Sequence, residues 1–510
     1  MDAFTLSLVA VFGALLYYYF YRPLSRFQRF GVPHDTPLPI LGNLLPCIRG
    51  KVLLCERLQE LYKKYPEAKY FGFFNFQKPI TVISDPELIT NIAVKNFDNF
   101  CNHRHVVDAK ADPLMGTNLF TLRGDDWRDM RRLLSPSFTS SKMKMMFNLV
   151  CDCAKNVVGH LAKTDKVINV KDIFGRYTND VVATCAFGIS IDSMKHPNNE
   201  FYYNGRDATN LESVLGLKFF LGDIFVTLSK VFGLRMVSKK VHEFFLGIIS
   251  ETVKMRDEQG IQRPDMLQLM MDSKDANNKR NLTIQQMTAQ AFVFFFGGFD
   301  TSSTAMSFIA YVLAAHPEVQ EKLRAEIKNV LKETGGKPTY DAVSQMKYMD
   351  AIASEVLRLY PQLAYVDRVC VKDFELPPAV PGAKPFVIKK GESVWFPTYA
   401  LMRDEQYYSE PDSFDPERFM NAPQPDQAIF LPFGIGPRYC IGNRFALMQS
   451  KVLMFHVLSY CELELPDKST GSIILAKKFF QMMPEKGFVV RILHADEDCA
   501  VIGTTMIKCQ

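Results

Sequence analysis

Apolar side chains recur at a three- and four-residue spacing over most of the chain, as they do along helices. The longest such pattern covers residues 281–317 and is apolar on almost every side, which is typical of a helix inside a protein core. Asn281 or Thr283 is placed to cap its first turn, and Pro317 ends it and opens the next helix. Further helical patterns cover residues 86–97, 125–134, 140–163, 317–332 and 443–460.

Short segments rich in aromatic and β-branched residues interrupt the helical patterns at residues 70–84, 385–397 and 487–492. The chain has 510 residues, 47% of them hydrophobic, and no repeat or low-complexity linker, so it can bury one large core. We therefore expect a mainly α fold with a small, discontinuous β-sheet region, in a single large domain over residues 47–492. The tail, residues 493–510, matches no pattern and is left unassigned.

The N-terminus has the pattern of a membrane anchor. Residues 3–21 carry no charge and are about long enough to span roughly 30 Å of hydrocarbon. Tyrosines gather at their C-terminal end, and Arg22, Arg26 and Arg29 follow. A cleaved signal peptide would need a basic start and a small-residue cleavage site, and a core helix would not end in arginines. We predict a transmembrane anchor that leaves the rest of the chain in the cytosol, followed by a stiff proline-rich linker over residues 22–46.

Charge and cysteine content exclude several classes of protein. The formal net charge of +5 is small and spread along the chain, which does not favour nucleic acid as a partner. The eleven cysteines are odd in number and irregularly spaced, and no zinc-binding pattern accompanies them. We expect ten of them to be reduced cytosolic thiols. Cys440 is the exception.

Cys440 lies among turn residues directly ahead of a predicted helix. Gly434 and Gly436 allow the backbone to approach a bulky planar ligand. The positive end of the helix dipole, with Arg438 and Arg444 nearby, favours the thiolate. Such a thiolate is a nucleophile or a metal ligand; a nucleophile needs a base, and no histidine lies close in sequence. A single thiolate without a neighbouring Cys or His indicates a macrocyclic iron, because haem supplies four nitrogens.

The long predicted helix carries a second unusual pattern at its middle. Gly297 and Gly298 should each cost about 1 kcal/mol relative to alanine, so something must require the missing side chains. The hydroxyl of Thr301 can open the helix and hold a water, and Asp300 beside it can supply protons. The alternative is a simple helix bend with an Asp-Thr pair on the surface.

These residues carry a resemblance. Phe433, Gly436, Arg438, Cys440 and Gly442 match F-x-x-G-x-R-x-C-x-G, the signature of the cytochrome P450 superfamily of haem-thiolate monooxygenases. Residues 297–302 resemble its [AG]-G-x-[DE]-T-[TS] motif. Its remaining motifs follow in the family's order, with Trp127 and Arg131 first, then Glu355 and Arg358, then Arg418. The resemblance covers residues 33–492 and is strongest to microsomal insect enzymes that clear foreign compounds.

The resemblance implies the cytochrome P450 fold, a bound haem b and a set of site residues. The residues expected to hold the haem are Trp127, Arg131, Arg368, Phe433, Arg438, Cys440 and Gly442, with Cys440 as the iron ligand. Asp300 and Thr301 are the expected proton relay, and Phe299 beside the glycines is expected in the substrate pocket. Glu355, Arg358 and Arg418 are expected to form a buried structural ion network.

The implied reaction inserts one oxygen atom of O2 into a lipophilic small molecule. Electrons are expected from membrane-bound NADPH–cytochrome reductase, with cytochrome b5 as an additional partner, at the endoplasmic reticulum membrane. Detoxification of plant toxins or insecticides is the expected role, and oxidation of an endogenous steroid or fatty acid is the alternative. A haem-thiolate isomerase or lyase would need neither reductase nor proton relay, and a non-catalytic haem or lipid-binding module would leave Asp300 and Thr301 without a purpose.

Overall fold

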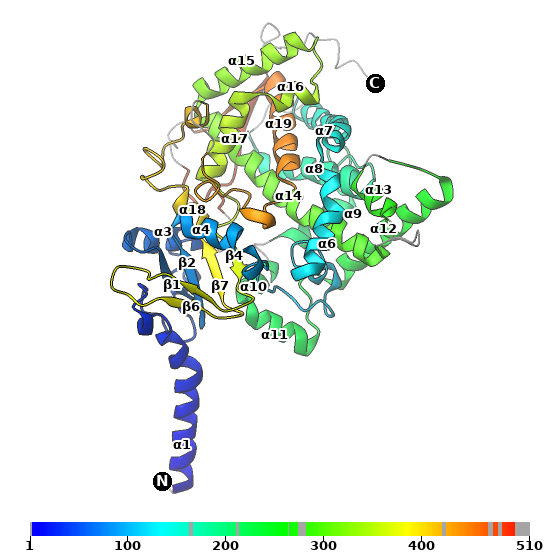
Figure 1. The fold of residues 1–510 in the computed structure, drawn as a ribbon. Coiled ribbons are helices and arrows are strands. Elements are labelled where there is room, and N and C mark those ends of the chain that lie inside the picture. Colours follow the sequence, from blue (N-terminus) through cyan, green and yellow to red (C-terminus); the bar gives the residue numbers. More distant parts are fainter. Residues whose placement is uncertain are drawn as a thin grey trace.

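Helices make up most of the molecule and surround one long helix, α14, which spans Ile284–Ala315 (Figure 1). The structure is a computed structural model. It describes residues 3–162, 167–210, 214–263, 265–273, 282–420, 425–467, 473–477 and 482–494, so nearly all of the unassigned tail lies outside the described residues.

The helices follow one another along the chain with short connections. Their bounds are α1 Ala3–Leu16, α2 Leu45–Ile48, α3 Leu54–Lys64, α4 Pro86–Thr90, α5 Pro113–Gly116, α6 Gly124–Leu134, α7 Ser140–Leu161, α8 Val170–Val182, α9 Glu200–Thr209, α10 Val214–Leu221, α11 Asp223–Phe232, α12 Lys239–Gln259, α13 Met266–Asp272, α14 Ile284–Ala315, α15 Pro317–Glu333, α16 Tyr340–Ser344, α17 Lys347–Leu359, α18 Thr398–Leu401 and α19 Asn443–Tyr460.

The ends of α14 confirm the predicted boundaries. Thr283 caps the helix, accepting a hydrogen bond from the Gln286 N–H while the Gln286 side chain accepts one from the Thr283 N–H. His316 ends the helix, and Pro317 is the first residue of α15. Helices α8, α12, α17 and α19 pack around α14, which explains why it is apolar on nearly every side.

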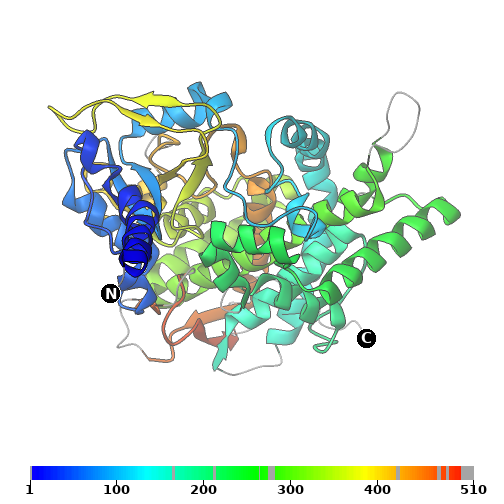
Figure 2. The same ribbon diagram turned by 90° about the horizontal axis from the view of Figure 1, so that it is seen from below.

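The strands form three small sheets, which agrees with the predicted small, discontinuous β-sheet region, although β3, β4, β5 and β8 lie outside the segments that the sequence predicts. The first has the order β1-β2-β7-β4, the second β3-β9-β8, and the third pairs β5 with β6. The bounds are β1 Tyr70–Asn75, β2 Lys78–Ile83, β3 Val167–Asn169, β4 Val366–Val369, β5 Phe374–Leu376, β6 Phe386–Ile388, β7 Ser393–Phe396, β8 Cys461–Glu464 and β9 Val489–His494. Figure 2 shows the first sheet and the N-terminal elements on one side of the molecule and the large helical part on the other.

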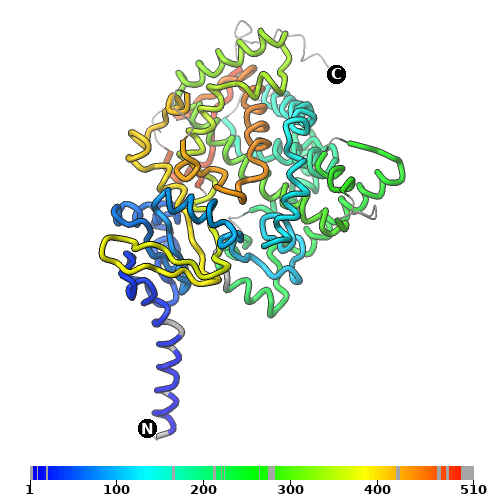
Figure 3. Tube along the Cα trace, viewed as in Figure 1, coloured from blue at the N-terminus to red at the C-terminus, as the bar shows by residue number. Residues whose placement is uncertain are grey.

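The N-terminal helix stands away from the body of the molecule (Figure 3). Helix α1 covers Ala3–Leu16, and the next residues, Tyr17–Tyr21, form a π-helical turn. Fourteen residues of α-helix measure about 21 Å, less than the roughly 30 Å of hydrocarbon in a bilayer. Within the described ranges, no helix has both the length and the apolar character needed to cross a membrane. The structure therefore does not show the transmembrane helix predicted over residues 3–21.

The segment after α1 is more closely packed than the predicted stiff linker. It forms two 3-10 turns, Arg22–Ser25 and Gln28–Phe30, and Phe27 between them is fully buried against the first sheet. The residues that follow run without helix until α2, as the prolines predict.

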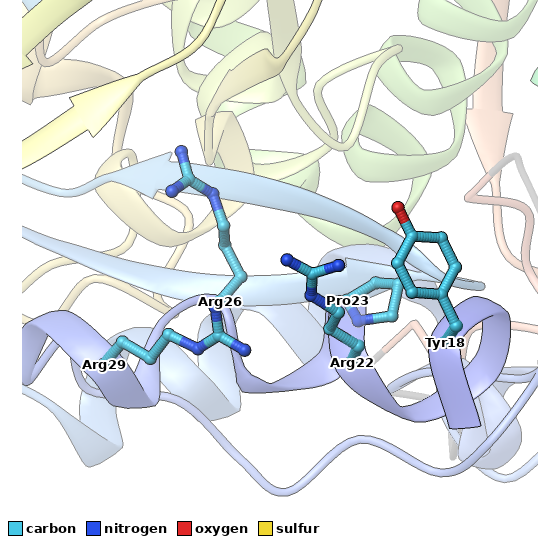
Figure 4. Close-up of a pocket in the computed structure, with 5 residues that line it drawn as sticks. All are labelled: Tyr18, Arg22, Pro23, Arg26 and Arg29. Atoms are coloured by element: carbon cyan, nitrogen blue, oxygen red, sulfur yellow. The ribbon is translucent and has the colours of Figure 1, made fainter. Parts of the chain in front are cut away.

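Figure 4 shows a cavity of about 360 Å³ at the base of α1, lined by Tyr18, Arg22, Pro23, Arg26 and Arg29. Arg26 pairs with Glu392 at 3.0 Å and donates to the Val387 carbonyl at 2.7 Å. These bonds tie the turns that follow α1 to β6 and to the segment that joins β6 and β7.

Candidate active site

The loop before α19 adopts a conformation that requires glycine. Gly436 has φ of +71°, and a Cβ on it would lie 2.2 Å from the Ala93 carbonyl oxygen. The Cys440 N–H closes the turn by donating to the Phe433 carbonyl at 2.9 Å. Gly442 precedes α19 directly, and a Cβ there would lie 3.8 Å from the Phe138 ring. The signature residues therefore place Cys440 three residues ahead of α19, as predicted.

Cys440 is the only exposed cysteine among those that the structure describes. It is nevertheless surrounded by protein: burial raises the pKa of its thiol, while the Gly442 N–H and the Arg131 guanidinium act in the opposite direction. The thiol is thus accessible and yet enclosed by protein, which is the case when it faces a space inside the molecule.

Burial raises the pKa of the Cys440 thiol more than the donors around it lower that pKa, so the end of the helix and its donors do not by themselves account for the predicted thiolate. Arg444 is also not one of those donors, since it bonds to the Ser140 hydroxyl at 2.7 Å. The cation that acts on the thiol is Arg131, on α6.

Helix α14 has an open stripe at its middle. Gly297 is exposed and Thr301 and Ala305 are half-buried, although most of the helix is buried. The three residues are four apart, so they lie on one side of the helix. Among the described residues, no atom outside the adjoining turns of the same helix lies within 4 Å of the position that a Cβ on Gly297 would take. The missing side chain therefore leaves real space, as the glycine pattern predicts.

The two predicted relay residues face different neighbours. The Thr301 hydroxyl lies on the open stripe and donates to the Gly297 carbonyl, which loosens the helix there. The Asp300 carboxylate pairs with Lys171 of α8 at 2.8 Å. Lys171 also bonds to the hydroxyls of Ser303 and Thr304. No sequence motif marked Lys171, because it lies 129 residues from Asp300.

Two buried arginines lie close to one another without an acidic partner. Arg368 donates to the Ile435 carbonyl at 2.8 Å, and Arg438 donates to the Cys101 and Leu122 carbonyls, each at 2.8 Å. Burial lowers the pKa of Arg368 to about 10, and burial together with the nearby Arg368 charge lowers the pKa of Arg438 to about 9. Neither forms an ion pair with a carboxylate in the part of the chain that the structure describes, and the Arg368 Nε has no partner. The Asp367 carboxylate is close enough for its charge to act on both guanidiniums, but it bonds to His103 and the Arg104 N–H, so two buried cations share one nearby carboxylate.

Helix α6 contributes the other two predicted donors. The Arg438 guanidinium lies 4.0 Å from the centre of the Trp127 ring. Arg131, one turn further along α6, is the residue whose charge acts on Cys440. The structure thus brings Trp127, Arg131, Arg368 and Arg438 together around the loop that carries Cys440.

A histidine-aspartate pair beside these arginines was missed by the sequence analysis. His103 Nδ1 lies 2.9 Å from Asp367 Oδ1, and the Arg104 N–H donates to Asp367 Oδ2 at 2.7 Å. Burial alone would raise the pKa of Asp367, but His103 and the Arg104 N–H hold it well below its usual range. His103 stacks on Phe120 with ring centres 4.9 Å apart. No motif links residue 103 to residue 367, so only the fold could show this pair.

The predicted ion network forms at the centre of the fold. Arg358 donates through two nitrogens to Glu355, at 2.7 and 2.8 Å, and both side chains are fully buried. Arg418 reaches Glu355 at 3.3 Å, and Arg358 also holds the Met402 and Pro411 carbonyls. These bonds fix the chain that leads toward the Cys440 loop.

Phe299 lies away from the open stripe. Its ring is buried, stacks on Phe295 at 5.0 Å and meets Tyr202 of α9 at 6.0 Å. The structure places it in the packing between α14, α8 and α9. Phe433 lies on the Cys440 loop with its ring 6.2 Å from that of Tyr439.

Taken together, the residues fit haem. An exposed thiol inside the protein can ligate iron, the open stripe on α14 leaves unfilled space, and two buried guanidiniums match the two propionates. Comparison with known proteins decides the family: the model described as Cytochrome P450 matches residues 32–491. The chain belongs to the cytochrome P450 family.

Relatives of this P450 are found among insects. It is 41% identical to "Cytochrome P450 9e2" of Blattella germanica over 498 residues, which is 91% of this chain and 92% of the relative. It is 39% identical to "Probable cytochrome P450 6a18" (86% and 88% covered) and 34% identical to "Probable cytochrome P450 9f2" (96% and 98%), both of Drosophila melanogaster. Membership makes the chain a monooxygenase that binds haem through a cysteine thiolate.

Proposed function

We propose that this P450 oxidises lipophilic foreign compounds, such as plant toxins or insecticides, with electrons from NADPH–cytochrome reductase. The observation that supports the assignment of the site is the combination of the exposed Cys440 thiol, the open stripe on α14 and two buried guanidiniums that form no ion pair in the described residues. When bound there, haem supplies the activation of dioxygen.

The chain's own residues bind and orient the cofactor. Cys440 is the iron ligand in this proposal, and the turn fixed by Gly436 aims its sulfur. Arg368 and Arg438 bind the propionates, supported by Arg131 and the Trp127 indole, and this anion relieves the repulsion between the two buried cations. Asp367 and His103 fix the strand and loop that carry these donors.

Protons are handled by α14. Thr301, on the open stripe, holds and transfers a proton toward the site of oxygen activation, and Asp300 renews it from the solvent side. Lys171 keeps the Asp300 carboxylate on the α8 side of the helix, so the acid and the hydroxyl occupy separate positions along one path.

Membrane attachment through the N-terminus belongs to the same proposal. Helix α1 is uncharged, exposes Phe4, Val11 and Phe12, and stands clear of the body (Figures 1 and 3). The arginines of Figure 4 follow at its base, which is the arrangement that keeps the catalytic domain on the cytosolic side. The endoplasmic reticulum membrane is the expected location, since the reductase resides there.

The test measures how electrons are used. Full-length protein is reconstituted with NADPH–cytochrome reductase in lipid, and product and hydrogen peroxide are counted per NADPH for a lipophilic insecticide. We expect Thr301→Ala to bind substrate normally and to divert electrons to peroxide, because losing a general acid commonly costs roughly 10²–10⁴-fold in rate. Unchanged coupling in Thr301→Ala, or product formation without NADPH, would contradict the proposal and favour an isomerase.

A further inference from the structure

A buried polar junction joins three helices beneath the proposed site. Gln449 of α19 is fully buried, and its Nε2 donates to the Ser302 hydroxyl of α14 at 2.7 Å. The backbone carbonyl of Gln449 accepts a hydrogen bond from the Tyr177 hydroxyl of α8 at 2.9 Å. Tyr177 is also fully buried, and Ser302 is 3% exposed. The surrounding core is apolar, so these hydrogen bonds, which depend on direction, lie among hydrophobic contacts, which do not.

This junction is not the most stable choice for its position. The Oε1 of Gln449 is buried without a hydrogen-bond partner in the described residues, and such an atom loses its hydration without compensation. Leucine or methionine would fill the same space between α14 and α19 without that cost. A polar pair that is kept in an apolar interface specifies register, because it forms at one relative position of the two helices.

The register of these two helices is the one that matters for the reaction. Ser302 directly follows Thr301 on α14, and α19 begins three residues after Cys440. Holding Ser302 against Gln449 therefore holds the relay hydroxyl against the element that carries the thiol. Helix α14 needs this support, since Gly297, Gly298 and the back-bonded Thr301 hydroxyl all weaken the turn before Ser302.

We propose that Gln449 is a positioning residue for oxygen activation, which acts through Ser302 to set the placement of Thr301 relative to Cys440. The inference rests on the proposed roles of Cys440 and Thr301. In this inference, a residue of α19, the helix that follows the Cys440 loop, helps to control proton delivery by Thr301 on α14.

The experiment compares Gln449→Leu, Ser302→Ala and the double variant with wild type, all as full-length haem-loaded protein with reductase. Gln449→Leu should keep its haem content, its carbon monoxide spectrum and its substrate dissociation constant. Product per NADPH should fall about threefold or more, with peroxide rising to match, because a small misplacement of a catalytic group is costly. Ser302→Ala should do the same. The double variant should be no worse than either single variant, since both remove one interaction.

Ser450→Ala is the matched control. Ser450 is the next residue on α19 and is buried, but its hydroxyl bonds only within its own helix, to the Ala446 carbonyl at 2.8 Å. It should lower thermal stability slightly and leave coupling unchanged. If Gln449→Leu loses haem, Ser302→Ala carries the test alone.

Two outcomes separate this inference from the proposed function. Coupling that falls in Thr301→Ala but not in Gln449→Leu or Ser302→Ala overturns the role of Gln449 and leaves the relay standing. Coupling that is unchanged in Thr301→Ala as well means that the relay itself is wrong. Additive losses in the double variant also overturn the inference, because they show two independent effects.

Discussion

The guanidiniums of Arg368 and Arg438 lie in a region where burial works against both charges. Backbone carbonyls satisfy part of their donors, but carbonyls are neutral and leave two positive charges in place. The side chains are therefore arranged for an anion that comes from outside the polypeptide. In the proposed site, these arginines would therefore bind the two propionates of haem.

Replacing the proposed iron ligand is the most direct test at this site. Cys440→His should retain some haem, because the arginines still bind the propionates, but should lose the carbon monoxide spectrum characteristic of thiolate ligation. The measurement is the difference spectrum of the reduced protein with carbon monoxide. Cys461→Ala, at a buried cysteine of β8, is the control and should keep the spectrum. Survival of the thiolate spectrum in Cys440→His rules out Cys440 as the ligand.

A buried histidine makes stability depend on pH. Burial lowers the pKa of His456 from 6.5 to about 4, so the folded protein holds it neutral. The contribution of the neutral His456 to the free energy of unfolding is complete above pH 6.5. It is lost as the pH falls toward 4, because the unfolded chain then binds a proton at this histidine more readily than the folded chain does. Between pH 7 and pH 5 the free energy of unfolding should fall by about 2 kcal/mol for this reason.

Thermal unfolding at these two pH values checks this dependence. His456→Gln should show a smaller drop in melting temperature between pH 7 and pH 5 than wild type. The exposed His196, changed in the same way, should not alter the drop. Equal drops in wild type and His456→Gln would mean that this histidine is already protonated or solvated when folded.

Which residues the sequence could identify follows from their separation along the chain. The Cys440 loop and the Glu355–Arg358 pair are short motifs, so their neighbours are visible in the printed sequence. The pairing of His103 with Asp367 joins residues 264 apart, and that of Lys171 with Asp300 spans 129. No periodicity records such contacts. Phe299 was predicted to lie in the substrate pocket because it follows two glycines. Its position in the sequence did not indicate that its ring packs against Phe295, on another side of the helix.

Helix α14 was predictable in length because its ends carry local signals, a capping box and a proline. The π-helical turns were not, among them Ala183–Phe187 at the end of α8. A π turn adds one residue to an apolar helical run without changing its composition, so tertiary packing alone selects it.

The two glycines of α14 should respond differently to alanine. Gly297→Ala projects into open space and should stabilise the helix by about 1 kcal/mol. Gly298→Ala brings a Cβ within 3.3 Å of Val182 Cγ2, so its gain should be smaller. In the proposed site, the methyl of Gly297→Ala also takes space beside the reacting centre.

Spin-state titration and thermal melting together measure both effects. Gly297→Ala should melt no lower than wild type and bind a bulky substrate several-fold more weakly, by roughly the cost of one methyl-sized clash. Gly298→Ala serves as its neighbour control. Wild-type substrate affinity in Gly297→Ala would show that the open stripe does not face the substrate.

The molecule as a whole separates into a protruding N-terminal helix and a body with its own cores. Deleting residues 1–22 should leave folding and the haem-thiolate spectrum intact, because Leu24 and Phe27 are the first residues buried in the body among those whose burial the structure describes. Membrane binding should weaken, measured by flotation with vesicles, while apolar surface elsewhere keeps some affinity.

A longer deletion through Phe27 is the informative comparison, since it removes a fully buried ring and should cost about 3–5 kcal/mol of stability. Loss of the spectrum already on deletion of residues 1–22, with full-length protein sound in parallel, would contradict an anchor that is separate from the fold.

The bonds of Arg26 and the burial of Phe27 fix the turns that follow α1 on the body of the molecule. Arg26 forms an ion pair with Glu392 and donates a hydrogen bond to the Val387 carbonyl, and the neighbouring Phe27 is buried against the first sheet. A flexible linker would let the body change its orientation relative to a bilayer, whereas a fixed attachment couples the orientation of the body to that of α1. In the proposed membrane-bound state, the tilt of α1 then sets the tilt of the whole catalytic body, and an electron donor diffusing in the same plane meets one preferred face.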